Sequence, residues 1–225
     1  MKKIGFIGAY DKTNILIYLS KIFVESGLKV LIIDTTILQK SRYTVPAIAP
    51  SRCYITSYEG IDVAIGFETI EEIKHYSGVQ ELDYDVVLID IDQNENLNKL
   101  DMKNADANYF VTGFDDYSLR RGLEVIGKGE ERIKMTKILV SKHMEKTEEE
   151  YLNFLSFYYA VEWNKGKIYF PFEAGDESII IDNQRAARIS FKELSMVYKE
   201  GLMQLVEQIT PEIKSGTVKK MFKNI

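Results

Sequence analysis

The chain has 225 residues, a net charge of −5 and 45% hydrophobic residues. These values suit one soluble α/β domain and give no overall electrostatic reason to bind nucleic acid, so we expect nucleic acid not to be a partner. The single cysteine excludes an intramolecular disulfide, and no stretch reaches the ~20 apolar residues of a membrane span. We therefore expect a cytoplasmic protein whose contact with a membrane is at most peripheral.

Short apolar runs alternate with helical patterns along the chain. The runs at 3–7, 29–34 and 84–92 predict buried strands, and residues 13–26 predict a helix that ends before Gly27. The alternation continues with strand-like RCYIT, IDVAIGF, NYFVTGF, TKILVSK and KIYFPF, and with helix-like ETIEEIKHY, DDYSLRRGLEVIGKG, EEEYLNFLSFYYAVE and SFKELSMVYKEGLMQLVEQI. This order predicts one doubly wound domain over residues 1–210, with a mostly parallel sheet flanked by helices.

The segment GAYDKTN, residues 8–14, lies between the first strand and the first helix, where a phosphate-binding loop would be. Such a loop uses glycine to bring backbone N–H groups close to phosphate, a lysine to contact phosphate oxygens, and a hydroxyl to hold Mg²⁺. Gly8, Lys12 and Thr13 match these three roles. Ligands of doubly wound sheets bind at the carboxyl ends of the strands, which is where we expect the candidate cofactor-binding residues: Gly8, Asp11, Lys12, Thr13, Asn14, Asp34 and Asp90.

These segments together resemble the MinD/ParA family of deviant P-loop ATPases, members of the SIMIBI class. The family loop reads approximately KGGxGKTT and is followed by a helix and a strand KVLxIDxD, as in residues 8–36 here; YDVVLIDID resembles the family strand YDxVLIDxP. The segments ADANYFVTGFDDYSLRRGLEVI and KIYFPFE resemble later family motifs. The resemblance implies a P-loop NTPase-like fold, a homodimer, and ATP with Mg²⁺ as cofactor where the site works, with Thr13 and Asp90 beside the metal.

The loop departs from the family pattern at several positions. Ile7 stands at the signature lysine, Ala9 and Asp11 at glycines, Asn14 at a hydroxyl, Thr36 at a switch acid and Asp92 at a proline. A carboxylate at position 11 would repel a triphosphate by about 1 to 4 kcal/mol. Because phosphoryl transfer depends on positioning and charge stabilisation, these changes predict a degenerate site, a pseudo-ATPase with no catalytic residue and no bound cofactor. We expect Asp11 to occupy the anion-binding concavity and to pair with Lys12.

Other interpretations of the same residues stay open. Asp11 or Thr13 could simply cap the helix, and Asp34 and Asp90 could cap the turns after their strands. An active ATP-dependent switch would place Lys12 and Thr13 on the phosphates and Asp90 near Mg²⁺, and a DNA-partitioning ATPase is a third possibility. The missing signature lysine and the acidic net charge count against both.

Residues 211–225 form a linker and a basic amphipathic tail. Apolar Val218, Met221, Phe222 and Ile225 recur at helical spacing, and Lys219, Lys220 and Lys223 fall on the other side. A helix of this kind can lie on an anionic membrane, and the tail resembles the C-terminal membrane-targeting helix of MinD proteins. The alternative is that the apolar face packs on the domain or on a partner.

The resemblance and the departures together predict a membrane-peripheral positioning or scaffold protein. TadZ-like members of the family, which have atypical ATPase domains, localise secretion and pilus machinery. A protein machine of that kind, in the cell envelope, is therefore the expected partner besides the membrane and a second copy of the chain.

Overall fold

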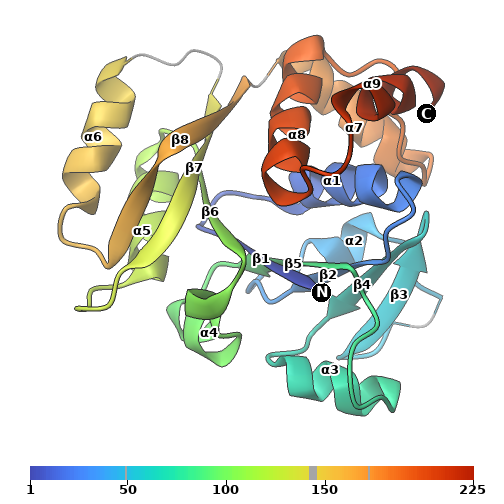
Figure 1. Cartoon of the computed structure of the whole chain (residues 1–225), viewed down its shortest axis with the longest axis horizontal. Helices are drawn as coiled ribbons and strands as arrows, with labels where there is room; N and C mark the ends of the chain where they lie inside the picture. The colour runs from blue at the N-terminus through green and yellow to red at the C-terminus, as the bar shows by residue number, and fades with distance from the viewer. Residues whose placement is uncertain (49, 142–145, 172) are drawn as a thin grey trace.

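The computed structural model describes residues 1–48, 50–141, 146–171 and 173–225. Lys142 of TKILVSK and Phe172 of KIYFPFE lie outside the described residues. One eight-stranded sheet with the order β3-β4-β2-β5-β1-β6-β7-β8 runs through the molecule (Figure 1). Its strands are β1 Lys2–Ile7, β2 Val30–Asp34, β3 Tyr54–Tyr58, β4 Ile61–Ile65, β5 Val86–Ile91, β6 Ala107–Thr112, β7 Ile133–Ser141 and β8 Val161–Pro171. Only the β3–β4 pairing is antiparallel among the described pairings, which confirms the mostly parallel, doubly wound fold.

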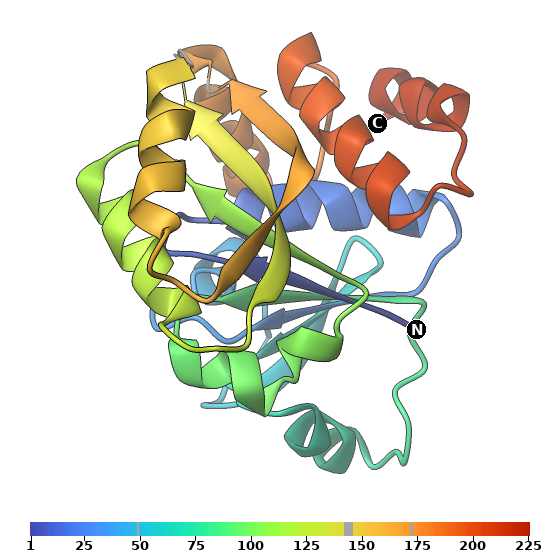
Figure 2. The same cartoon turned by 60° about the vertical axis from the view of Figure 1, so that its left-hand side comes forward.

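Helices cover both faces of this sheet (Figure 2). They are α1 Thr13–Glu25, α2 Ser41–Thr44, α3 Ile70–Ser77, α4 Asn94–Lys99, α5 Gly122–Ile126, α6 Lys146–Ser156, α7 Ala174–Arg185, α8 Met196–Ile209 and α9 Ser215–Asn224, with a 3₁₀ turn at Met102–Asn104 and a π-helical turn at Tyr117–Arg121. One core packs α1, α7, α8 and α9 against the sheet, and the other packs α3, α4, α5 and α6. In β1, Ile4 and Phe6 belong to the first core and Ile7 to the second, as the two-residue period of a strand requires.

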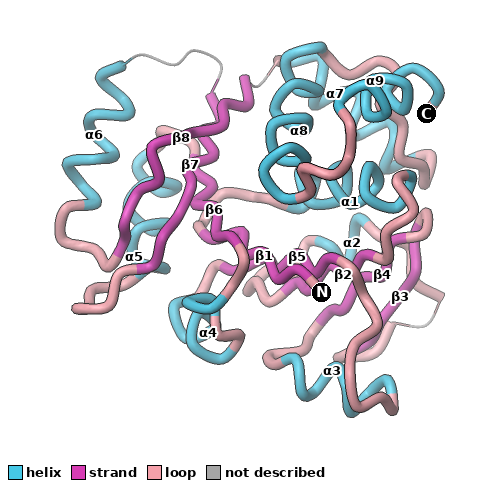
Figure 3. The backbone as a smooth tube through the Cα atoms, in the orientation of Figure 1, coloured by secondary structure: helices cyan, strands magenta, loops and turns pink. Residues whose placement is uncertain are grey.

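The middle of the chain departs from the expected helices and strands. The predicted helix EEEYLNFLSFYYAVE ends at Ser156, and Val161 and Glu162 belong to β8 instead. Helix α8 begins at Met196 and not within SFKELS, because the Ser195 side chain accepts the Tyr198 N–H as an N-cap. The sequence pattern did not indicate α7, whose amphipathic character is weak. Figure 3 shows α7 next to α8, on the same side of the sheet as α1, and residues of this missed helix line one cavity of the site described below.

Helix α9 packs its apolar side on the domain. Val218 and Phe222 are 1% and 5% exposed, and the Phe222 ring lies 5.2 Å from that of Phe191. The Ile225 carbonyl accepts the Ser190 hydroxyl at 2.7 Å, which ties down the end of the chain. The packing alternative left open for this tail is therefore the arrangement observed, while Lys219, Lys220 and Lys223 are exposed. No helix within the described residues is long and apolar enough to cross a membrane.

Candidate functional site

The loop between β1 and α1 begins at Gly8, at the carboxyl end of a central strand. Gly8 has φ +134°, and a Cβ added there would lie 2.4 Å from the Val111 carbonyl oxygen. The Gly8 N–H donates to the Ile91 carbonyl at 3.0 Å, which holds the loop against β5. Glycine is therefore required both by the backbone conformation and by the close approach of β6.

The Lys12 side chain turns back into the loop that carries it. Its ammonium donates to the carbonyls of Gly8 at 2.7 Å and Tyr10 at 2.9 Å, and lies 3.0 Å from Asp90 Oδ1. Lys12 is only 2% exposed. The charge that a phosphate-binding loop would direct at its ligand is thus bound by the protein's own oxygens.

The carboxylate of Asp90 lies at the end of β5 and is fully buried. Burial, opposed by Lys12, raises the pKa of Asp90 to about 7, and the nearby Asp34 adds to the rise. The contact with Lys12 is an ion pair whose geometry does not make a hydrogen bond, so Oδ1 has no hydrogen-bond partner among the described residues. Lys12 favours the ionised form of Asp90, but burial outweighs it, so the pKa of this carboxyl lies above its ordinary value.

Asp11 does not pair with Lys12, which corrects our expectation. Its Oδ1 accepts the Thr13 N–H at 3.0 Å, and its Oδ2 pairs with Lys40 at 2.8 Å. Burial raises the pKa of Asp11, but the hydrogen bonds from Lys40 and Thr13 outweigh burial and leave this pKa below its usual value. Lys12 is unavailable to Asp11 because the loop carbonyls and Asp90 already surround it. Asp11 instead accepts the N–H of Thr13, the first residue of α1, and links the loop to the segment after β2 through Lys40.

The acids after β2 and β5 hold backbone turns. Asp34 accepts the N–H groups of Thr36 at 3.0 Å and Ser41 at 3.1 Å, so it caps the segment that leads into α2. Both oxygens of Asp92 lie 3.1 Å from the Ile37 nitrogen. The turn-capping interpretation of Asp34 therefore describes what its side chain does here. Asp92, the residue at the family's proline position, holds the same segment after β2 through the Ile37 N–H.

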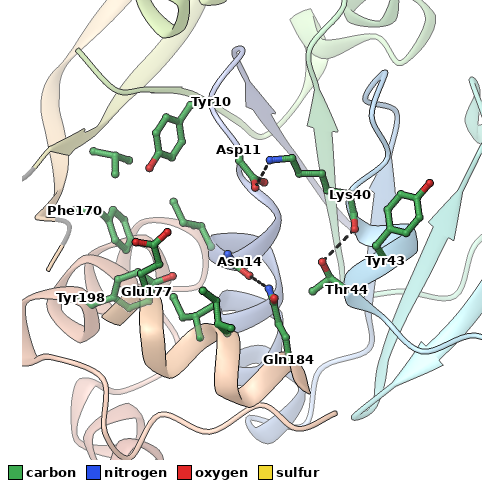
Figure 4. Close-up of a pocket in the computed structure, with 14 residues that line it drawn as sticks. Tyr10, Asp11, Asn14, Lys40, Tyr43, Thr44, Phe170, Glu177, Gln184 and Tyr198 are labelled. Carbon is green, nitrogen blue, oxygen red and sulfur yellow. Dashed lines mark hydrogen bonds and ion pairs between the residues drawn. The ribbon is translucent and has the colours of Figure 1, made fainter. Parts of the chain in front are cut away.

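Two cavities border the loop. One, of about 300 Å³, is lined by residues that include Lys12, Thr13, Asp90, Asp92 and Arg121. The other, of about 400 Å³, lies on the side of α7 and α8 and is lined by Asn14, with residues that sequence reasoning missed: Tyr10, Lys40, Glu177, Gln184 and Tyr198 (Figure 4). Asn14 accepts a hydrogen bond from Gln184 at 2.8 Å. No sequence motif indicated these missed residues, because four of the five lie outside the loop: one just before α2, two on α7 and one on α8.

The predicted residues thus come together, but not in an arrangement that presents charge to a nucleotide. Gly8, Asp11, Lys12, Thr13, Asn14, Asp34 and Asp90 all lie at the carboxyl ends of β1, β2 and β5 or at the start of α1. Neither the Lys12 ammonium nor the Asp90 carboxylate offers a free charge to phosphate or Mg²⁺ in this arrangement. Among the described residues no group of three or more acids, histidines or cysteines is placed to hold a metal ion.

The fold of this chain is similar to that of several solved structures. No protein-family model matches the chain, and no curated protein sequence matches it. A ParA family ATPase from Chlorobium tepidum superposes with a TM-score of 0.55 at 12% identity, covering 99% of this chain and 96% of that one. MinD in the MinC:MinD cell division complex of Aquifex aeolicus gives 0.56 at 16%, covering 92% and 96%, and the ATP complex of a Cyanothece McdA variant gives 0.58 at 12%, covering 96% and 98%.

Proposed function

We propose that this chain, which has the ParA/MinD-like ATPase fold over nearly its whole length, is a pseudo-ATPase that works as a membrane-peripheral positioning or scaffold protein. The observation that carries the proposal is the position of Lys12. Its ammonium is bound by two loop carbonyls and Asp90, and is 2% exposed. A lysine held in this way stabilises the loop without a ligand and gives up those contacts if it turns toward a phosphate.

Asp11 adds to this argument. Its carboxylate lies at the start of α1, where a phosphate would otherwise meet the backbone N–H groups, and it already accepts the Thr13 N–H. A triphosphate would have to displace this carboxylate or lie beside it, at a cost of about 1 to 4 kcal/mol. The loop therefore contains its own anion.

An assay of phosphate release tests whether the protein hydrolyses ATP. The wild type, with millimolar ATP and Mg²⁺, should release no phosphate above a protein-free control, with or without anionic vesicles. Ala9→Gly combined with Asp11→Gly restores two family glycines and serves as the comparison variant. Sustained release by the wild type, abolished by Lys12→Met in a protein that remains folded, would support the active switch instead.

The membrane part of the proposal rests on α9. Its apolar side is packed on the domain, so the groups open to an anionic surface are Lys219, Lys220 and Lys223. Each lysine near such a surface contributes roughly 1 kcal/mol, and the whole tail carries four lysines against one glutamate. Changing all three lysines to glutamate should prevent sedimentation with phosphatidylserine vesicles without unfolding the protein.

A matched control separates this effect from net charge. Lys103, Lys134 and Lys165 are exposed and lie elsewhere, so their triple change to glutamate alters the total charge equally. That control should still bind vesicles at low salt. If both triple variants lose binding equally, or if the wild type does not bind, α9 is not a membrane-contacting element.

Self-association is the remaining part of the proposal. Exposed apolar side chains surround the loop face: Ile37 and Leu38 are 62% and 67% exposed, and Tyr117 is 69% exposed. All three line the cavity that borders Lys12. A second copy of the chain would bury this face. Sedimentation velocity should show a dimer that Ile37→Asp with Leu38→Asp dissociates; a monomeric wild type at tens of micromolar, well above typical dimer constants, would contradict it.

A further inference from the structure

The cavity on the α7 side of the loop differs in character from a phosphate site. It encloses about 400 Å³ between the start of α1 and helices α7 and α8, within the range of small-molecule sites (Figure 4). Its inner surface includes Ile15, Val140, Phe170 and Ile180, all buried. The Phe170 and Tyr198 rings meet edge to face with centroids 5.4 Å apart. The cavity therefore offers an apolar and aromatic surface to a ligand body.

The Tyr198 hydroxyl is a buried polar group without a partner in the described part of the chain. Tyr198 is 4% exposed and its oxygen makes no hydrogen bond to any residue that the structure describes. Burial raises the pKa of Tyr198 well above its ordinary value, and the nearby Tyr18 and Asp176 raise it further, so the hydroxyl stays neutral. A buried hydroxyl without a hydrogen-bond partner destabilises the ligand-free protein. A ligand that donates a hydrogen bond to this oxygen would recover that cost.

The charged residues of the cavity leave an excess negative charge. Asp11 is neutralised by Lys40, whose Nζ lies 2.8 Å from its Oδ2. Glu177 also lines the cavity, and none of the ion pairs formed by described residues includes it. Burial raises the pKa of Tyr10 to about 12, and the carboxylates of Asp11, Asp115 and Glu177 add to that rise.

Three aromatic rings and the free carboxylate face the same space. Figure 4 places Glu177 close to Phe170 and Tyr198, with the Tyr10 hydroxyl directed toward them. A carboxylate next to aromatic faces attracts an organic cation by ion pairing and by cation–π interaction. An anionic ligand would meet Glu177, and the lysine among the described lining residues, Lys40, is already paired with Asp11.

We propose that this cavity binds a small organic ammonium ion with an apolar or aromatic body. The ammonium would contact Glu177 and donate to the Tyr198 hydroxyl, and the body would lie on Phe170 and Ile180. The proposal does not rest on nucleotide binding: Lys12 does not line this cavity, although Tyr10, Asp11 and Lys40 line both cavities.

Titration by calorimetry or NMR with small ligands of similar shape but different charge tests the proposal. The probes are 2-phenylethylamine, neutral 2-phenylethanol and anionic 3-phenylpropanoate, with butylamine as an aliphatic amine. At least one amine should bind the wild type about tenfold or more tightly than the alcohol and the carboxylate, a difference of about 1.4 kcal/mol. Glu177→Gln should remove this preference and leave alcohol binding unchanged.

Glu173→Gln is the matched control, since Glu173 is exposed, lies one turn earlier at the start of α7 and does not line the cavity. It should bind the amine as the wild type does. Tyr198→Phe keeps the ring and removes the hydroxyl, so it should weaken the amine severalfold while leaving the ligand-free protein at least as stable as the wild type. The proposal is overturned if neither amine binds at 10 mM, if amine and alcohol bind alike, or if Glu173→Gln and Glu177→Gln weaken the amine equally.

Discussion

The two cavities on either side of the start of α1 differ in how their polar groups are satisfied. On the β5 side, Lys12 is enclosed by loop carbonyls and Asp90, and Asp11 is paired with Lys40. On the α7 side, Glu177 has no ion pair among the described residues and the Tyr198 hydroxyl has no hydrogen-bond partner. The polar groups of the loop are thus satisfied within the protein, whereas the cavity beside it contains a carboxylate and a hydroxyl that have no such partner among the described residues.

The largest effect is expected from removing the Lys12 ammonium. Lys12→Met leaves two loop carbonyls and Asp90 without their cation, and the free energy of unfolding should fall by about 3 kcal/mol in the absence of any nucleotide. Adding Asp90→Asn should recover part of the loss. Urea unfolding measures both. A lysine that served only a phosphate ligand could be removed from the ligand-free protein without this cost, so an unchanged midpoint would contradict the self-contained loop.

The backbone at the start of the loop should be nearly as sensitive. Gly8→Ala puts a Cβ 2.4 Å from the Val111 carbonyl oxygen at φ +134°, and should destabilise the protein by about 1 to 3 kcal/mol. Gly216→Ala in α9 is the control, because nothing lies within 4 Å of its added Cβ. Thermal unfolding should separate the two variants clearly; equal midpoints would mean that the loop relaxes away from β6.

More of the fold than of the site could be predicted from the sequence. Unbroken apolar runs such as residues 29–34 indicate strands covered on both faces, and they fix the parallel sheet and its carboxyl edge. Helix α7 escaped because its apolar and polar residues are poorly segregated. Because this helix was not predicted, Glu177 and Gln184 were not recognised as site residues, and the second cavity that they line was missed.

Within the loop, the residue types alone did not determine which partners the side chains of Asp11 and Lys12 contact. The residues DKT allow Asp11 to pair with Lys12, but the two neighbours contact Lys40, from the segment after β2, and Asp90, from β5, instead. These partners are 29 and 78 positions away from the residues they pair with. Only the packed sheet brings them to the loop, so no local pattern could have assigned them.

The pH dependence of stability should report on Asp90. Its pKa in the folded protein, about 7, lies above the value of an unfolded chain, so the folded state binds more protons between these values. Its contribution is therefore complete below the unfolded pKa and is lost as the pH rises through 7. Relative to Asp90→Asn, the wild type should lose stability from pH 5 to pH 8 in urea titrations; an opposite slope would mean that the Lys12 ammonium outweighs burial.

The smallest effect is expected at the partly exposed Asp11–Lys40 pair. Lys40→Met should lower the free energy of unfolding by at most about 1 kcal/mol, since both side chains retain contact with solvent. The difference from wild type should shrink in 1 M NaCl, where charges on the surface are screened. A loss as large as that of Lys12→Met would show that the link between the loop and the segment after β2 is as important as the buried lysine.

Calorimetric titration of the wild type with ATP and Mg²⁺ tests the central claim most directly. The account holds that loop carbonyls and Asp90 occupy the Lys12 ammonium and that the Asp11 carboxylate lies where a phosphate would bind. No saturable heat should then appear up to about 5 mM ATP, while an amine probe still binds the cavity beside the loop. Saturable binding of ATP with a dissociation constant well below 1 mM would show that Lys12 leaves its carbonyls for phosphate, and would contradict the account.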